Sequence, residues 1–228
     1  MLFGWDPTMV VLIPALVLAF YAQSKVRSTF ARYSRVTLAN PVTGAQAARR
    51  ILDDAGLSDV RIERIGGQLA DHYDPRKRVL RLSGEVHDYP SVAAVGVAAH
   101  EAGHAIQHQH GYVPLAFRNA IVPVAQFGSN AAFILFLAGF FFQATGLMDL
   151  GILLFGAAVL FQVVTLPVEY NASGRALAIL ADNGTVTTRE RQGVREVLNA
   201  AALTYLAAAL MAVLQLVRLL LLRGSRRD

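Results

Sequence analysis

Long apolar runs flank a polar segment in this chain, and they predict a membrane protein. Four stretches approach or exceed the roughly 20 apolar residues that a helix needs to cross the hydrocarbon core. They are residues 2–22, 119–143, 147–168 and 200–222. No Lys, Arg, Asp or Glu occurs between Asn119 and Met148, which favours a membrane hairpin over a buried hairpin of a soluble protein. We therefore expect a mainly α-helical integral membrane protein with about four transmembrane helices.

The polar segment between the first two runs, residues 23–118, predicts a small α+β domain. Thr43 precedes a stretch with apolar residues at helical spacing, and Gly56 ends it, so a short helix is expected there. Residues 60–65 then alternate apolar and polar side chains, as a half-buried strand does. The segment is therefore expected to begin with a helix followed by a strand.

Two further strands and a second helix are expected in the same segment. The Gly-Gly pair at residues 66–67 predicts a hairpin turn. Residues 68–73 and 78–82 are strand candidates, with an Asp-Pro turn between them. Ser91 is a suitable N-cap for the helix that follows. We expect a small antiparallel sheet and then this helix.

Basic residues follow the first apolar run instead of preceding it. Only Asp6 lies near its start, whereas four basic residues come soon after its end. They are Lys25, Arg27, Arg32 and Arg35. A cleaved signal peptide carries its positive charges before its apolar core, so this run is expected to stay as a transmembrane helix. The positive-inside preference then predicts that the residues after the first run face the cytoplasm, as do those after the third.

The fourth run, residues 200–222, leaves two alternatives open. If it crosses the membrane, the basic tail that starts at Arg223 lies outside, against the positive-inside preference. Otherwise it packs as an interfacial or re-entrant helix. Arg218 within the run fits that amphipathic role, and it equally fits a side chain that snorkels to a headgroup.

The candidate chemistry lies in the pentapeptide HEAGH, residues 100–104. On a helix its two histidines lie four residues apart on one face, within reach of one Zn²⁺. Glu101 is placed to take a proton from a metal-bound water. It is the only Lys, Arg, Asp or Glu between Ser91 and Gln107. Such a composition is typical of a buried metal-binding helix and disfavours a surface helix with two incidental histidines.

A catalytic zinc site needs a third protein ligand beside His100 and His104. Glu169 follows the third apolar run, where the membrane hairpin returns the chain to the side of the HEAGH motif, and we predict it as that ligand. His108 continues the row of histidines, but such a row drifts about 40° around the helix per step, so we expect His108 to lie behind the ligands or in solvent. His108 and His72 are the alternatives if Glu169 is not the ligand. The chain has no cysteine, so nitrogen and oxygen atoms must hold the zinc.

The net charge of +5 and the pI of about 9.9 raise the question of a nucleic-acid partner. The basic residues lie in loops that are predicted to face the cytoplasm, and no nucleic-acid-binding motif contains them. We therefore expect no nucleic-acid partner. The basic run from Lys25 to Arg35 is expected to contact anionic headgroups of the lipid bilayer. A homo-oligomer or another membrane partner stays open.

Three runs of the sequence resemble one family. Residues 95–107 around the HEAGH motif, residues 71–75 and residues 167–173 look like the YugP-type neutral zinc metallopeptidases of bacterial membranes. The order of HExxH, membrane hairpin and Glu-x-x-Ala also resembles the HtpX and CAAX-prenyl-protease group of gluzincins. In that group the later Glu is the third zinc ligand, and this role maps onto Glu169.

One position departs from the gluzincin pattern. That group usually has Asp directly after the Ala of Glu-x-x-Ala, and this chain has Ser173 there. The carboxylate that would accept a hydrogen bond from a zinc-binding histidine and orient it is therefore missing. Asn171 or Ser173 is expected to orient a ligand instead.

The resemblance implies a zinc endopeptidase of the bacterial inner membrane, with its site facing the cytoplasm. Zn²⁺ held by His100, His104 and Glu169, with Glu101 as general base, would hydrolyse peptide bonds of membrane or membrane-proximal proteins. The polar segment is then the zincin-like metallopeptidase domain.

The stabilisation of the tetrahedral oxyanion requires a further hydrogen-bond donor. His72 and Tyr73 are the first candidates, and Tyr170 and Arg175 are two more. The strand at residues 79–82 is expected to pair with an extended substrate by edge addition, which fits an endopeptidase.

Two other functions stay open: a zinc-dependent hydrolase of another amide-type bond, and a non-catalytic membrane adaptor with a structural zinc. Glu101 argues against the adaptor, since a structural zinc normally has four protein ligands and needs no base. The predicted division of the chain is residues 1–22 as the first transmembrane helix, 23–118 as the cytoplasmic metallopeptidase region, 119–168 as the transmembrane hairpin, 169–199 as a cytoplasmic helix with the third ligand, and 200–228 as a fourth transmembrane or interfacial helix with a basic tail.

Overall fold

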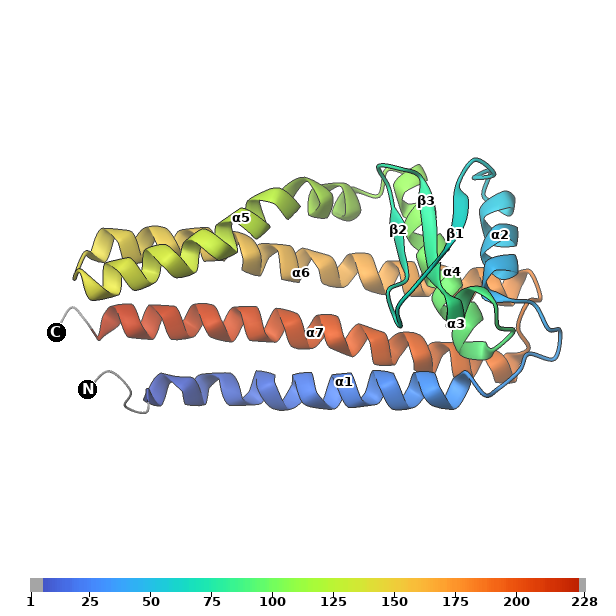
Figure 1. Ribbon diagram of the computed structural model, residues 1–228, viewed down its shortest axis with the longest axis horizontal. Coiled ribbons are helices and arrows are strands. Elements are labelled where there is room, and N and C mark those ends of the chain that lie inside the picture. Colours follow the sequence, from blue (N-terminus) through green and yellow to red (C-terminus); the bar gives the residue numbers. More distant parts are fainter. Residues whose placement is uncertain (1–5, 226–228) are drawn as a thin grey trace. The chain divides into compact units, whose positions relative to one another are not determined.

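The computed structural model describes residues 6–225, and their contacts form two compact units. The first, which we call the apolar unit, contains the described parts of Met1–Ala22, Ala116–Pro167 and Thr204–Asp228. The second, the polar unit, contains Gln23–Leu115 and Val168–Leu203. Four of the described helices have residues in both units, because α1, α5, α6 and α7 each continue past a unit boundary. Figure 1 shows these helices.

Among residues 6–225, four helical segments are long and apolar enough to cross a membrane, which agrees with the expected number. They are Pro7–Tyr33, made of the 3-10 turn η1 (Pro7–Leu12) and helix α1 (Ile13–Tyr33), then α5 (Val113–Phe141), α6 (Thr145–Asp182) and α7 (Thr188–Gly224). Residues 2–5 of the first predicted run lie outside the described residues. Two helices extend well past the predicted runs, since α6 continues through Pro167 to Asp182 and α7 begins at Thr188. The prediction of a single separate helix at residues 169–199 is therefore wrong, because these residues contain the end of α6 and the start of α7.

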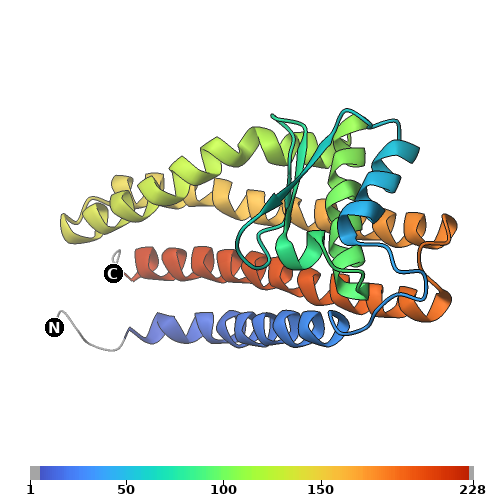
Figure 2. The same ribbon diagram turned by 45° about the vertical axis from the view of Figure 1, so that its right-hand side comes forward.

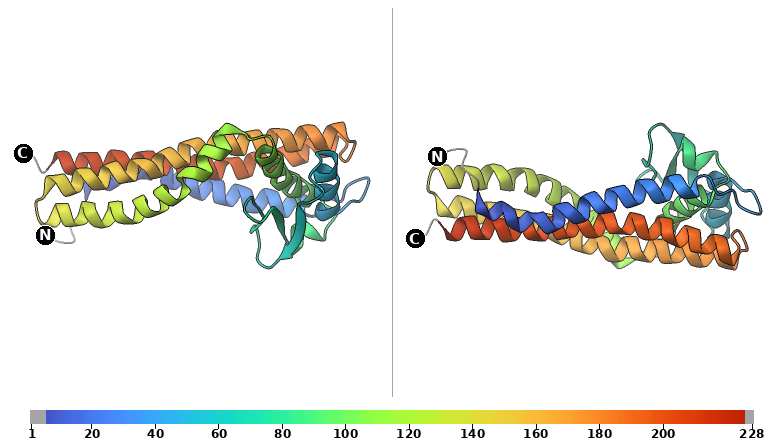
Figure 3. Two further views of the ribbon diagram at one scale, coloured as in Figure 1. Left: turned by 90° about the horizontal axis from the view of Figure 1, so that it is seen from above. Right: turned by 90° about the horizontal axis from the view of Figure 1, so that it is seen from below.

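Close approach of backbones joins α5 and α6 within the apolar unit. A Cβ atom on Gly151 would lie 2.7 Å from the carbonyl oxygen of Ala132, and one on Gly139 would lie 2.6 Å from the backbone nitrogen of Met148. Small residues at helix interfaces allow such packing in membranes. The two helices form the predicted hairpin, with a short turn after Phe141 (Figure 3).

Two ion pairs join α7 to the start of α1 and the start of α6. The Arg218 guanidinium lies 2.6 Å from Asp6 Oδ2, and Arg223 donates two hydrogen bonds of 2.7 Å to Asp149. The second half of α7 therefore lies antiparallel to the first part of α1, which favours a full crossing over a re-entrant helix. Arg218 is paired with Asp6 within the apolar unit, a contact that the sequence did not indicate, and its snorkelling or amphipathic role stays a prediction.

The polar unit contains a three-stranded sheet and the helices α2, α3 and α4. Figure 2 shows the sheet beside these helices. Helix α2 (Gly44–Asp54) begins at Thr43, whose side chain accepts a hydrogen bond from Gln46 N–H in a capping box. Its apolar face is buried, and the burial of Ile51 and Leu52 stabilises the fold by about 1.5–3 kcal/mol each. Both the predicted helix and its N-cap are confirmed.

The sheet is mixed, so the prediction of an antiparallel sheet is wrong. Strands β1 (Arg61–Ile65), β2 (His72–Asp74) and β3 (Val79–Ser83) have the order β1-β3-β2, and β1 pairs with β3 in parallel. Only β2 and β3 form a hairpin. The Gly-Gly signal after β1 begins a longer loop instead of a two-residue turn, and this loop carries the chain past β3 to the far edge. The prediction that β3 offers a free edge to substrate is also wrong, because both of its edges are paired.

Helix α4 (Val92–Gln109) is the central element of the polar unit. The hydroxyl of Ser91 accepts a hydrogen bond from Ala94 N–H, as predicted for the N-cap. The helix contacts α2, the short helix α3 (Gly84–His87), β2 and β3. Its alanine and valine side chains belong to one buried core with residues of α2, β3 and α6. This packing holds the HEAGH motif in a rigid helix.

Candidate metal centre

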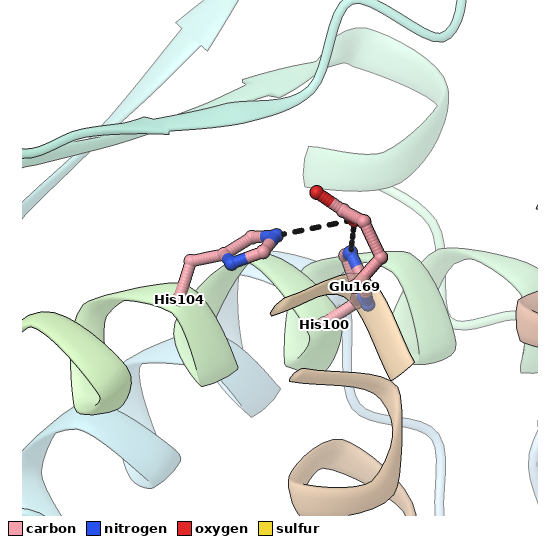
Figure 4. A group of neighbouring side chains, drawn as sticks. All are labelled: His100, His104 and Glu169. Carbon is pink, nitrogen blue, oxygen red and sulfur yellow. Dashed lines mark hydrogen bonds and ion pairs between the residues drawn. The ribbon is translucent and has the colours of Figure 1, made fainter. Parts of the chain in front are cut away.

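Three side chains from two helices meet at one point in the polar unit (Figure 4). Glu169 Oε2, from α6, lies 3.1 Å from His100 Nε2 and 3.5 Å from His104 Nε2, both from α4. The side chain of Glu169 is only 5% exposed, and the two imidazoles are 12% and 11% exposed. The structure thus brings together the three residues that the sequence predicted as metal ligands.

The donor set and its spacing fit a zinc ion. Ligand atoms about 2.0–2.2 Å from a tetrahedral zinc lie about 3.3 Å or slightly more from one another. The two distances from the carboxylate, 3.1 and 3.5 Å, bracket the lower end of that range. Within the described residues, His100, His104 and Glu169 are the group whose ligand atoms all lie within 4.8 Å of one another. Three protein ligands leave one coordination position for water or substrate, as in catalytic zinc sites.

The Nε2 atoms of the two histidines face Glu169, and their Nδ1 atoms each contact an uncharged side chain. His100 Nδ1 lies 3.1 Å from Ser173 Oγ, and His104 Nδ1 lies 3.0 Å from Gln107 Oε1. If both Nδ1 atoms carry the proton and donate it, both Nε2 lone pairs face the Glu169 carboxylate. Ser173 therefore occupies the position predicted for a residue that orients a ligand.

A buried amide chain fixes the second imidazole, and the sequence analysis missed it. Gln107 is fully buried, and its Nε2 donates to the carbonyl oxygen of Val168 and to Asn171 Oδ1, each at 2.9 Å. Arg175 Nε donates to the same Asn171 oxygen at 2.8 Å. The available signal was the position of Gln107, one turn after His104 on the same helix face. Arg175, a candidate oxyanion donor, is thus engaged in the chain that orients His104.

The carboxylates around His104 shift its protonation. Burial alone would lower the pKa of the imidazole, but Glu169 and Glu101 raise the pKa above its ordinary value of 6.5. A metal ligand must be neutral, so metal binding at this site requires His104 to release any proton on Nε2.

Glu101 lies on α4 between the two histidines, but its carboxylate contacts β2 and not the group formed with Glu169. Its side chain is buried, and its Oε2 accepts a hydrogen bond of 3.1 Å from the backbone N–H of Tyr73. This bond holds the carboxylate toward β2, and Glu101 is absent from the group of three metal-ligating atoms. Its position therefore fits a base beside the metal instead of a fourth ligand.

Strand β2 exposes one backbone edge on the side of Glu101. It is an outer strand of the sheet, and Tyr73 pairs with Leu80 of β3. Because the Tyr73 N–H bonds to Glu101, it is not used in the ladder with β3. An outer strand can accept a second, extended chain through backbone groups that no other strand uses. The outer strand next to Glu101 is β2, and its Tyr73 N–H is already bonded to that carboxylate.

The other predicted site residues lie around this centre. Tyr73 Oη lies 3.0 Å from His108 Nδ1, so His108 is exposed beside the strand and outside the group of three ligands. The His72 ring lies 2.8 Å from the carbonyl oxygen of Ala70 and 3.3 Å from Arg81. Tyr170 is half exposed on α6. None of these contacts tests the predicted oxyanion roles of His72 and Tyr73.

Asp71 is a half-buried carboxyl that anchors the start of β2. It accepts hydrogen bonds from the N–H and the hydroxyl of Ser83 at the end of β3. Burial raises its pKa above the ordinary value of 3.8, and the nearby Glu101 charge adds to the increase, although the bonds from Ser83 oppose it. The sequence did not single out Asp71 or Ser83 as part of the site.

We expect Asp71→Asn to flatten the pH dependence of stability. A raised folded-state pKa means that Asp71 stabilises the fold fully below pH 3.8, and that this stabilisation is lost as the pH rises through the folded value. Asn keeps an oxygen acceptor for Ser83 but cannot ionise. Thermal unfolding at pH 4 and pH 7 should show a larger gain in Tm at pH 7. An equal effect at the two pH values would contradict the assignment.

Gly103 allows α4 and α6 to approach each other at the site. A Cβ atom there would lie 2.9 Å from the carbonyl oxygen of Ala172, on the helix that supplies Glu169 and Ser173. A side chain at this position would push the ligands of the two helices apart. The glycine of HEAGH is therefore a packing requirement of the metal centre.

Gly103→Ala is expected to destabilise the fold by about 1–3 kcal/mol, the usual cost of overpacking, and to weaken zinc binding. Gly174→Ala is the matched control on α6, because no atom lies within 4 Å of a Cβ there. It should stabilise the helix by about 0.5–1 kcal/mol. Thermal melts and zinc titrations measure both. The same Tm and zinc affinity for Gly103→Ala and wild type would rule out the steric role.

Comparison with known proteins agrees with this centre. The sequence profile of a family described as "Putative neutral zinc metallopeptidase" matches residues 8–224. A protein of Bacillus subtilis (strain 168), named "Putative membrane protease YugP", is 50% identical over 216 residues, covering 95% of this chain and 96% of that protein. No solved structure matches the chain. The membrane relative and the four apolar helices together indicate a multi-pass membrane protein.

Proposed function

Because the chain belongs to this family of neutral zinc metallopeptidases, we propose that it is a membrane-embedded zinc endopeptidase. Its substrates would be membrane proteins or polypeptides close to the membrane. The observation that carries the proposal is the meeting of Glu169 with His100 and His104, with Glu101 held beside them by the Tyr73 N–H.

His100, His104 and Glu169 would hold the zinc ion. When bound, zinc supplies a Lewis acid that polarises the scissile carbonyl and makes a water molecule acidic near neutral pH. Ser173 and Gln107 keep the two imidazoles in the required orientation through their outer nitrogens.

Glu101 would act as the general base and then as the general acid. Its carboxylate accepts a proton from the attacking water and returns that proton to the leaving amine. The Tyr73 N–H keeps one carboxylate oxygen in place, while the other oxygen stays available for the proton. A structural metal site has no need for such a residue, so this arrangement favours an enzyme.

The substrate would bind as an extended chain along the outer edge of β2. Edge addition uses the backbone hydrogen bonds of the substrate and therefore places little demand on its sequence. Tyr73 lies on this edge, so we keep it as the candidate that contacts the substrate near the scissile bond. Burial raises the pKa of its phenol, which therefore stays a hydrogen-bond donor at neutral pH.

The proposal also includes the side of the membrane on which the metal centre lies. The basic residues that follow Ala22 favour a site that faces the cytoplasm, since cytoplasmic segments next to membrane helices are rich in Lys and Arg. The substrates would then be cytoplasmic segments of membrane proteins or polypeptides at that surface.

Metal removal tests the proposal directly. Full-length protein in detergent should cleave an unfolded model protein, lose this activity after treatment with a zinc chelator, and recover it with added zinc. Mass spectrometry of the products should show new internal amino and carboxyl termini. Product formation that persists in the zinc-free protein would contradict the proposal. Zinc-dependent release of terminal residues alone would exclude an endopeptidase.

A further inference from the structure

A second pocket lies in the polar unit, where α1 ends. It has a volume of about 520 Å³, within the usual range for small-molecule sites. Side chains from α1 and the residues directly after it, from the β1–β2 loop and from α3 line it. Those that matter here are Arg27, Arg35, Gln68, Leu69, Glu85 and Tyr89. None of them belongs to the metal centre.

The pocket contains two guanidinium groups without a protein partner. Within the described residues, Arg27 and Arg35 form no hydrogen bond or ion pair, whereas Arg32 on the same helix lies 3.7 Å from Glu196. The one carboxylate in the pocket, Glu85, accepts a hydrogen bond of 2.9 Å from Gln68. The pocket thus has two positive charges and one negative charge, and the negative charge already accepts a hydrogen bond. This balance favours an anionic ligand, and a phosphate matches the paired N–H donors of a guanidinium best.

The position of Arg27 on α1 relates the pocket to the bilayer surface. The apolar run of the helix ends at Ala22, and Arg27 lies five residues later, or about 7.5 Å along the axis at 1.5 Å per residue. The headgroup layer on each side of the hydrocarbon core is about 5–8 Å thick. If the apolar run of α1 fills the hydrocarbon core up to Ala22, Arg27 lies at the depth of the lipid phosphates.

Two exposed apolar side chains complete the pocket. Tyr89 is 59% exposed and Leu69 is 45% exposed, and tyrosine is enriched at the membrane–water interface. Leu69 also has a φ of 52°, in the left-handed region that is strained for a leucine. Strained backbone is retained where it serves a site. Here it lies on the loop that leads into β2.

From these observations we infer that the pocket binds the phosphodiester of an anionic lipid headgroup. Arg27 and Arg35 hold the phosphate oxygens, and Tyr89 and Leu69 contact the adjoining glycerol and upper acyl region. A lipid bound there anchors the β1–β2 loop, and with it the start of β2, at the membrane surface. The inference goes beyond the proposed peptidase activity and does not depend on it.

The test measures lipid binding by full-length protein in neutral detergent. Phosphatidylglycerol is added in mixed micelles, and the increase in Tm and the number of bound lipids by native mass spectrometry are followed. Phosphatidylcholine, whose phosphate is offset by choline, and soluble glycerol phosphate are the comparison ligands. We expect saturable binding of phosphatidylglycerol and at least about tenfold weaker binding of the two others. Choline offsets the phosphate charge in phosphatidylcholine, and glycerol phosphate lacks the acyl chains that Tyr89 and Leu69 would contact.

Arg27→Gln and Arg35→Gln should each weaken phosphatidylglycerol binding about tenfold or more. Arg32→Gln is the matched control, because it removes the same charge from the same helix end but lies outside the pocket. Arg27→Lys keeps the charge without the fork, and we expect intermediate affinity. Unchanged binding in Arg27→Gln and Arg35→Gln, or equal loss in Arg32→Gln, would overturn the site. Equal saturation by glycerol phosphate, or displacement of the lipid by an acidic peptide, would overturn the lipid as its ligand.

Discussion

Glu101→Gln is expected to lower kcat/KM for polypeptide cleavage by about 100-fold or more, the usual contribution of a general base. The zinc content should stay at the wild-type level, because Glu101 is not one of the three ligands. Glutamine keeps an oxygen that accepts the Tyr73 N–H, so the fold around the site should be preserved. Cleavage of an unfolded model protein and metal analysis of the same sample measure the two effects together.

The control for this variant is Glu63→Gln on β1. Glu63 is a half-buried carboxylate of the same unit, and its partners are Arg61 and Arg81. Its substitution should leave cleavage within about twofold of wild type, because Glu63 belongs neither to the group of metal-ligating residues nor to the proposed proton transfer. If Glu101→Gln retains wild-type cleavage, the proposed base is wrong and another group must accept the proton.

Glu169→Ala should raise the dissociation constant for zinc by at least about 100-fold. Loss of residues that merely orient zinc ligands costs 10–100-fold, so the loss of a ligand is expected to exceed that range. The variant also leaves His100 and His104 without the buried carboxylate that lies between them. Competition with a chromogenic chelator measures zinc affinity, and cleavage should be lost at limiting zinc.

Asp182→Ala is the matched control for the loss of the Glu169 carboxylate. Asp182 is an exposed carboxylate at the end of the same helix, in the same unit. Its substitution should leave zinc affinity unchanged. Wild-type zinc affinity in Glu169→Ala would exclude Glu169 as a ligand and would redirect attention to His108, the nearest remaining histidine on α4.

The parts of the site that the sequence predicted are those that depend on local spacing. Two histidines at i and i+4 must share a helix face, and Ser91 caps that helix as its residue type suggests. The apolar runs predicted four membrane helices by length alone. Glu169 followed from its place after a run that returns the chain to the same side. Each of these rests on a rule that needs no knowledge of distant contacts.

The parts that the sequence did not predict depend on contacts between distant residues. Turn signals predict that a chain reverses, but they do not fix which strands pair, so the order β1-β3-β2 was missed. The amide chain from Gln107 to Asn171 joins residues 64 positions apart. The pairing of Arg218 with Asp6 spans 212 positions, and without it a basic residue in an apolar helix suggests a headgroup contact.

The most direct test follows the rate of cleavage while zinc is returned to metal-free wild-type protein. If His100, His104 and Glu169 hold one catalytic ion, the rate should rise in proportion to bound zinc and stop rising at one zinc per chain. A cleavage rate that is independent of the zinc content, or that needs no zinc at all, would contradict the account.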